Sequence, residues 1–143
     1  MIEKRLPSSL ANAERPADAD DCRMMKLCPS ECRDLIKLLS GTQSLNASLD
    51  KRCLVILDVR TMQEYRSGHL NGSINLDFRS ASFADELARL DRSKPYLVYC
   101  RTGVRSARTA ALMKSLGFRE IYDLAGGIAG WQREGFEIVS ERQ

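Results

Sequence analysis

Apolar residues along the chain alternate between short runs and stripes with helical spacing. Runs in which apolar residues predominate lie at 24–27, 53–57 and 96–100, and shorter stretches that mix apolar with polar residues lie at 73–76 and 120–124; all five predict strands. Stripes with helical spacing predict helices from Pro29 to about Ser40 and from Ser106 to Leu116, and shorter helices after Thr61, Ser82 and Gly127. Strands that alternate with helices favour an α/β fold, a central parallel sheet flanked by helices on both faces.

The first 22 residues show neither the apolar runs typical of strands nor the spacing typical of helices. They are polar, contain Pro7 and Pro16, and end in an acidic stretch. We therefore expect 1–22 to be a mobile N-terminal tail and 23–143 to form one domain, since 143 residues can enclose one substantial core.

The most informative stretch runs from Tyr96 to Ser106. A strand without polar alternation ends at Cys100, a short loop follows, and a helix begins near Ser106. The amide N–H groups and the positive dipole end of that helix point back at the loop. Arg101, Arg105 and Arg108 add positive charge, with no acidic residue among them. Together these features favour a thiolate at Cys100, a nucleophile in an anion-binding loop.

The spacing of the loop limits what it holds. In cysteine-based phosphatases the loop runs Cys-x5-Arg around a phosphoryl group, whereas here Ser106 takes the arginine position and Arg105 comes one residue sooner. A shorter loop forms a tighter cup, which suits one added sulfur atom better than phosphate.

Three segments in this order resemble the rhodanese-type sulfurtransferases. The first is Leu57-Asp58-Val59-Arg60 with the following Glu64 to Asn75 stretch, the second is 100–106, and the third is Tyr122 to Trp131. The resemblance covers about 24–139. Within it, Asn71 stands where proline is usual and Ser73 where alanine is usual.

The resemblance implies a single rhodanese-like domain that transfers a sulfane sulfur from thiosulfate, or a related donor, to cyanide or a thiol. Cys100 would be the catalytic nucleophile and would carry the sulfur as a persulfide. Asp58 and Arg60 would connect the strand end to the loop. No cofactor or metal is implied, and a thioredoxin-like protein is a candidate acceptor. The loop residues expected to bind substrate are Arg101, Thr102, Gly103, Val104, Arg105 and Ser106.

Two other functions stay open. The domain could be a non-catalytic or regulatory binding module, although such modules often lack the cysteine. It could also be a phosphatase or an arsenate reductase, which the short loop disfavours.

Charge and cysteine content limit the binding partners and the cellular compartment that we expect. A net charge of +3 and the lack of a basic run with aromatics argue against nucleic acid, and no apolar stretch is long enough for a membrane span. Five scattered cysteines without an export signal predict reduced thiols and a cytoplasmic location. Cys22, Cys28 and Cys32 lack metal-site spacing, so we expect Cys22 at the surface, whereas packing explains Cys32 and Cys53.

Overall fold

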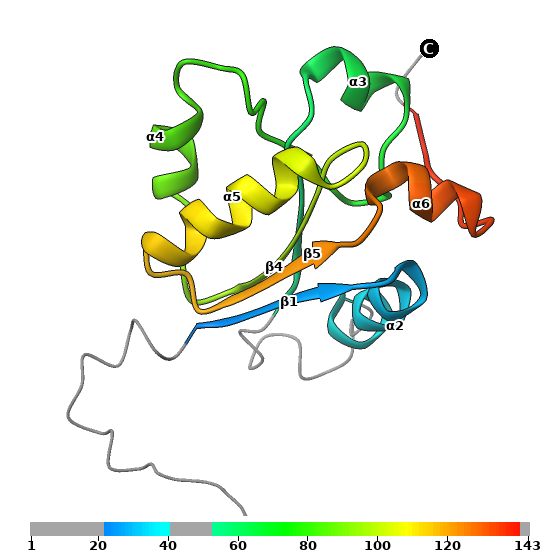
Figure 1. Ribbon diagram of the computed structural model, residues 1–143, viewed down its shortest axis with the longest axis horizontal. Helices are drawn as coiled ribbons and strands as arrows, with labels where there is room; N and C mark the ends of the chain where they lie inside the picture. Colours follow the sequence, from blue (N-terminus) through cyan, green and yellow to red (C-terminus); the bar gives the residue numbers. More distant parts are fainter. Residues whose placement is uncertain (1–21, 41–52, 141–143) are drawn as a thin grey trace, which may run out of the picture.

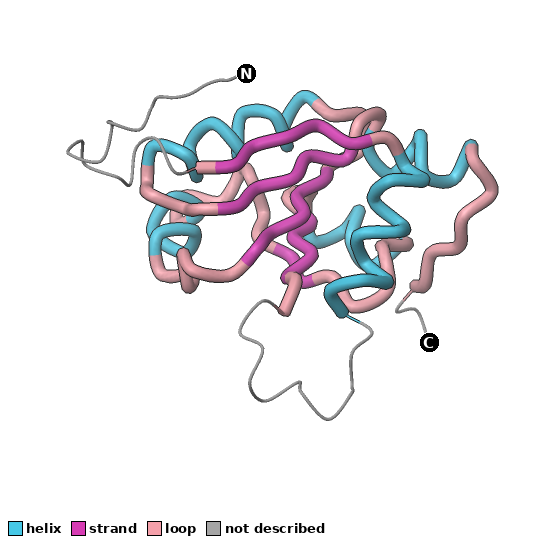
Figure 2. The backbone as a smooth tube through the Cα atoms, turned by 90° about the horizontal axis from the view of Figure 1, so that it is seen from below, coloured by secondary structure: helices cyan, strands magenta, loops and turns pink. Residues whose placement is uncertain are grey.

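The computed structural model describes residues 22–40 and 53–140, and within them the strands form one parallel sheet. The strand order is β1-β5-β4-β2-β3, so β4 lies at the centre (Figure 2). The strands are β1 (Arg23–Leu27), β2 (Val55–Asp58), β3 (Ile74–Asn75), β4 (Pro95–Tyr99) and β5 (Glu120–Leu124). The α/β fold with a parallel sheet is therefore confirmed.

Helices cover both faces of the sheet (Figure 1). On one face α4 and α5 pack on β4 through Phe83, Leu87 and Met113, and on the other α2 and α6 pack through Cys32, Ile128 and Trp131. The helices are α2 (Pro29–Ser40), α3 (Met62–Ser67), α4 (Phe83–Ala88), α5 (Val104–Ser115) and α6 (Gly127–Arg133).

The central strand explains why its sequence has no polar alternation. All of β4 is buried, with Tyr96 and Val98 in one core cluster and Leu97 and Tyr99 in the other. Fully burying an apolar side chain of this size contributes about 1.5–3 kcal/mol. The strand that ends at Cys100 is therefore fixed from both sides.

Several local predictions need correction. Cys53 is exposed and precedes β2, which begins at Val55, so packing does not explain it. Cys22 is partly buried against the core rather than a surface residue. Helix α5 begins at Val104, not Ser106, because Gly103 adopts a left-handed conformation and forms the N-cap.

Positions 1–21 of the predicted tail lie outside the described residues, and the helix predicted after Thr61 is confirmed as α3. At α3 the capping box is present: the Thr61 hydroxyl accepts from the Glu64 amide, and the Glu64 carboxylate accepts from the Thr61 amide. In the described parts of the chain, no helix has the length and apolar character that crossing a membrane requires.

Candidate active site

The sulfur of Cys100 lies in a cup of backbone amides. Cys100 follows the last residue of β4 and is 1% exposed. Its Sγ accepts hydrogen bonds from the amide of Gly103, at 3.1 Å, and from the amide of Ser106, at 3.3 Å. Both donors belong to the loop that the sequence singled out. Amide donors of this kind stabilise negative charge on sulfur.

Helix α5 supplies the second part of the cup. It has 12 residues and begins directly after Gly103, whose φ of 117° turns the chain into the helix. The amides of Val104 and Arg105 belong to the first turn, where N–H groups have no partner within the helix. With the helix dipole they create a positive potential above the sulfur. An anion at this end of the sheet is therefore favoured.

The beginning of α6 forms hydrogen bonds with the backbone of the loop. The amides of Ile128 and Ala129 donate to the carbonyls of Cys100 and Arg101, at 2.9 and 3.0 Å. This approach requires Gly127: a Cβ there would lie 2.3 Å from the Arg101 carbonyl oxygen, and its φ is 63°. The absence of a side chain at Gly127 thus allows the backbones of α6 and the loop to meet.

The side chain of Arg105 forms an ion pair with Glu64. Its Nη1 and Nη2 donate to Oε1 and Oε2 of Glu64, at 2.9 and 3.2 Å. These bonds lower the pKa of Glu64 to about 2, with the capping contacts to Thr61 contributing. No local sequence pattern joins Glu64 to Arg105, because the two residues are 41 positions apart.

Ser106 connects the sulfur to a buried carboxylate. Its Oγ lies 3.6 Å from Cys100 Sγ and donates to Oδ1 of Asp123 at 2.7 Å. Asp123 is 4% exposed, and its Oδ2 lies 3.5 Å from Nζ of Lys26. The sequence offers one signal for Asp123: it lies near the carboxyl end of the predicted strand 120–124, and ligands bind at that edge of a parallel sheet.

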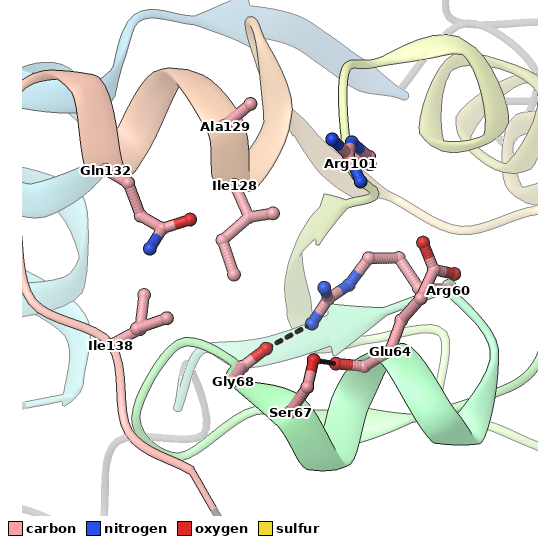
Figure 3. Close-up of a pocket in the computed structure, with 9 residues that line it drawn as sticks. All are labelled: Arg60, Glu64, Ser67, Gly68, Arg101, Ile128, Ala129, Gln132 and Ile138. Carbon is pink, nitrogen blue, oxygen red and sulfur yellow. Dashed lines mark hydrogen bonds between the residues drawn. The ribbon is translucent and has the colours of Figure 1, made fainter.

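A cavity of about 330 Å³ opens beside the loop. Figure 3 shows Arg60, Glu64 and Gly68 on one wall and residues of α6 on the opposite wall, with Arg101 also facing the hollow. Arg101, Thr102 and Val104 are all exposed, but of these three only Arg101 lines the cavity. The full lining is Arg60, Glu64, Ser67, Gly68, Arg101, Ile128, Ala129, Gln132 and Ile138.

Asp58 and Arg60 form a buried pair at the end of β2. Arg60 Nη2 contacts Asp58 Oδ2 at 2.7 Å and also donates to the Gly68 carbonyl at 2.6 Å. The side-chain amide of Asn75 donates to the carbonyls of both residues. These bonds fix the wall of the cavity, and Arg60 also lines it.

Comparison with known proteins gives the class that this fold and site represent. The sequence profile of the Rhodanese-like domain matches residues 42–134, and the chain belongs to that family. The thiosulfate sulfurtransferase GlpE of Coxiella burnetii is 35% identical over 82 residues, which are 57% of this chain and 75% of that protein. The GlpE of Pseudoalteromonas translucida is 31% identical over 96 residues, 67% of this chain and 89% of that protein.

A solved structure supports the same assignment. The crystal structure of a rhodanese-related protein from Thermoplasma volcanium superposes with a TM-score of 0.65 and is 28% identical. The match covers 82% of this chain and 99% of the other.

Proposed function

We propose that the protein is a sulfurtransferase that moves a sulfane sulfur from thiosulfate, or a related donor, through a persulfide on Cys100. One observation carries the proposal: Cys100 Sγ lies in a cup formed by the amides of Gly103 and Ser106 at the N-terminus of α5. The likeness to proteins named thiosulfate sulfurtransferase supports the choice of donor.

The first half-reaction loads the cysteine. The Cys100 thiolate attacks the outer sulfur of thiosulfate, a new S–S bond forms, and the old S–S bond breaks so that sulfite leaves with its electron pair. The persulfide then carries the negative charge on its terminal sulfur. The remaining first-turn amides, those of Val104 and Arg105, are in position to stabilise this charge.

The second half-reaction returns the cysteine to its starting state. Cyanide or a thiolate attacks the terminal sulfur, its bond to Cys100 Sγ breaks, and the thiolate is restored. The 330 Å³ cavity is the acceptor side of the site, with Arg101 attracting anionic donors and acceptors. Cavities of this size take small molecules; a thioredoxin-like acceptor would present its thiol here.

The remaining loop residues have distinct roles in this proposal. Gly103 supplies both an amide and the turn, Ser106 supplies an amide and a hydroxyl, and Thr102 and Val104 form the exposed rim. Arg105 acts as part of an ion pair with Glu64, so its charge toward the donor is partly neutralised. Asp58 and Arg60 hold the cavity wall.

We also propose a reducing compartment, the cytoplasm, as the location. All five cysteines are free thiols, and Cys100 needs its thiol unoxidised in each cycle.

A coupled assay tests the function. Purified protein with thiosulfate and cyanide is expected to produce thiocyanate, and Cys100→Ser is expected to abolish that product. Cys28→Ser is the matched control and is expected to leave turnover unchanged, because Cys28 is exposed at the start of α2. Absence of thiocyanate with the intact protein favours a binding module, and hydrolysis of an aryl phosphate instead favours a phosphatase.

A further inference from the structure

We propose that Asp123 is a positioning residue for Cys100, acting through the Ser106 hydroxyl. The inference rests on the proposed role of Cys100 as the nucleophile. In this arrangement the carboxylate turns the hydroxyl proton away from the sulfur, so the oxygen of Ser106 faces Cys100 only as a hydrogen-bond acceptor.

The geometry decides where the hydroxyl proton lies. A serine hydroxyl has one proton to donate. Its possible acceptors are Asp123 Oδ1, at 2.7 Å, the Gly103 carbonyl, at 3.2 Å, and the sulfur of a Cys100 thiolate, at 3.6 Å. The bond to the carboxylate is shorter and charge-assisted, and such bonds are roughly twice as strong as neutral ones. Ser106 is fully buried and Asp123 nearly so, so water does not compete for the proton.

Once its proton is directed to Asp123, the Ser106 oxygen presents only lone pairs to Cys100 Sγ. The Ser106 oxygen, 3.6 Å from Sγ, can accept from a thiol S–H but offers no proton to a thiolate. Among the described residues, the sulfur accepts hydrogen bonds only from the amides of Gly103 and Ser106. A thiolate with fewer donors is a stronger nucleophile, because nucleophilicity falls as the stability of the anion rises.

Other charged groups surround the loop, but most of them are paired with one another. Lys26 of β1 balances Asp123 from the exposed side. At the end of β2, Asp58 pairs with Arg60, and Glu64 of α3 pairs with Arg105 of α5. Arg101 is exposed at the cavity. Asp123 differs from these groups because it reaches the sulfur through a hydroxyl.

Alkylation of Cys100 as a function of pH tests the inference on the full chain. Iodoacetamide labelling is followed on the Cys100 peptide by mass spectrometry, which separates it from the other cysteines. Asp123→Ala frees the hydroxyl to donate to the thiolate and removes a buried negative charge. We expect the half-maximal pH to fall by about one unit and the plateau rate to fall about threefold.

A double-mutant cycle separates positioning from other effects. In the Ser106→Ala background the same Asp123→Ala change is expected to move the half-maximal pH much less, because the connecting hydroxyl is gone. An unchanged half-maximal pH in Asp123→Ala overturns the inference, and so does an equal shift in both backgrounds, which indicates a charge acting through space. If Asp123→Ala does not fold, Asp123→Asn keeps the shape and is expected to shift in the same direction.

The outcome is independent of sulfur transfer. Alkylation requires no thiosulfate, so a failed thiocyanate assay together with the expected shifts removes the proposed function and leaves the positioning role. Thiocyanate production with no shift in the half-maximal pH of alkylation supports the proposed function and removes the positioning role of Asp123.

Discussion

At the scale of single residues, the two loop arginines take different roles although the sequence presents them alike. Arg101 is exposed and lines the cavity, whereas Arg105 is partly buried and bound to Glu64. The cation available to an incoming anion is therefore chiefly Arg101. Sequence reasoning placed both in the substrate site because it saw only their distance from Cys100.

Arg101→Ala is expected to raise KM for thiosulfate roughly five- to tenfold, with a smaller effect on kcat. The reason is the loss of about 1–1.4 kcal/mol of attraction for the dianion. Steady-state thiocyanate kinetics measure it. Arg119→Ala is the matched control, since Arg119 is exposed just before β5, at the opposite end of the strand from the site. Equal KM values for the two variants contradict the assignment.

The Glu64–Arg105 pair makes the stability of the fold depend on pH in acid. Because the pKa of Glu64 is lowered to about 2 in the folded chain, the unfolded chain binds its proton first as pH falls. The pair contributes fully above the ordinary carboxyl value, and this contribution is lost as pH falls toward about 2. We expect a loss on the order of 1 kcal/mol, since the pair is partly exposed.

Urea unfolding over this acid range measures that contribution. Glu64→Gln, which can keep the cap at α3, is expected to flatten the acid dependence, while Glu134→Gln at the end of α6 is not. Parallel curves for Glu64→Gln and the unaltered chain are incompatible with this role for the pair.

At the scale of elements, the strands and helices could be predicted because apolar runs and stripes report burial directly. Cys100 at the end of the central strand followed from the same pattern. The partners could not be predicted: Glu64 meets Arg105 across 41 positions and Asp123 meets Ser106 across 17. Such contacts depend on which strands pair and where α3 folds back, and no local pattern encodes that.

The support that α6 gives the loop leads to a prediction at this scale. Gly127→Ala is expected to cost at least about 2 kcal/mol, because it adds left-handed strain and a Cβ clash with the loop backbone. Sulfur transfer is expected to fall with it as the cup shifts. Urea unfolding and the thiocyanate assay measure both.

Gly72→Ala is the control for strain alone. Its φ is 85°, but nothing lies within 4 Å of the added Cβ. It is expected to cost about 1 kcal/mol and to leave turnover intact. Similar losses of activity in both variants speak against a supporting role for α6.

At the scale of the whole molecule, two cysteines that are equally buried differ in where the fold places them. Cys32 belongs to α2 and has no exposure, and burial raises its pKa to about 12. Cys100 is equally buried by area, yet it lies at the carboxyl ends of the strands, beside the first turn of α5. The fold therefore places one thiol in the core on α2 and the other at the N-terminus of α5.

This difference predicts the order of chemical modification. At neutral pH, Cys100 is expected to react with iodoacetamide at least tenfold faster than Cys32, which becomes reactive only when the chain unfolds. Peptide-resolved mass spectrometry in native buffer and in urea gives both rates. Equal modification rates for Cys100 and Cys32 in native buffer contradict the proposed difference in reactivity between the two thiols.

The proposed function requires that Cys100 accept a sulfur atom from thiosulfate. The most direct measurement is the intact mass of the protein after incubation with thiosulfate and removal of excess reagent. We predict a gain of one sulfur atom that maps to Cys100, is absent in Cys100→Ser and is discharged by cyanide. An unchanged mass for the folded protein, or a gain that persists in Cys100→Ser, contradicts it.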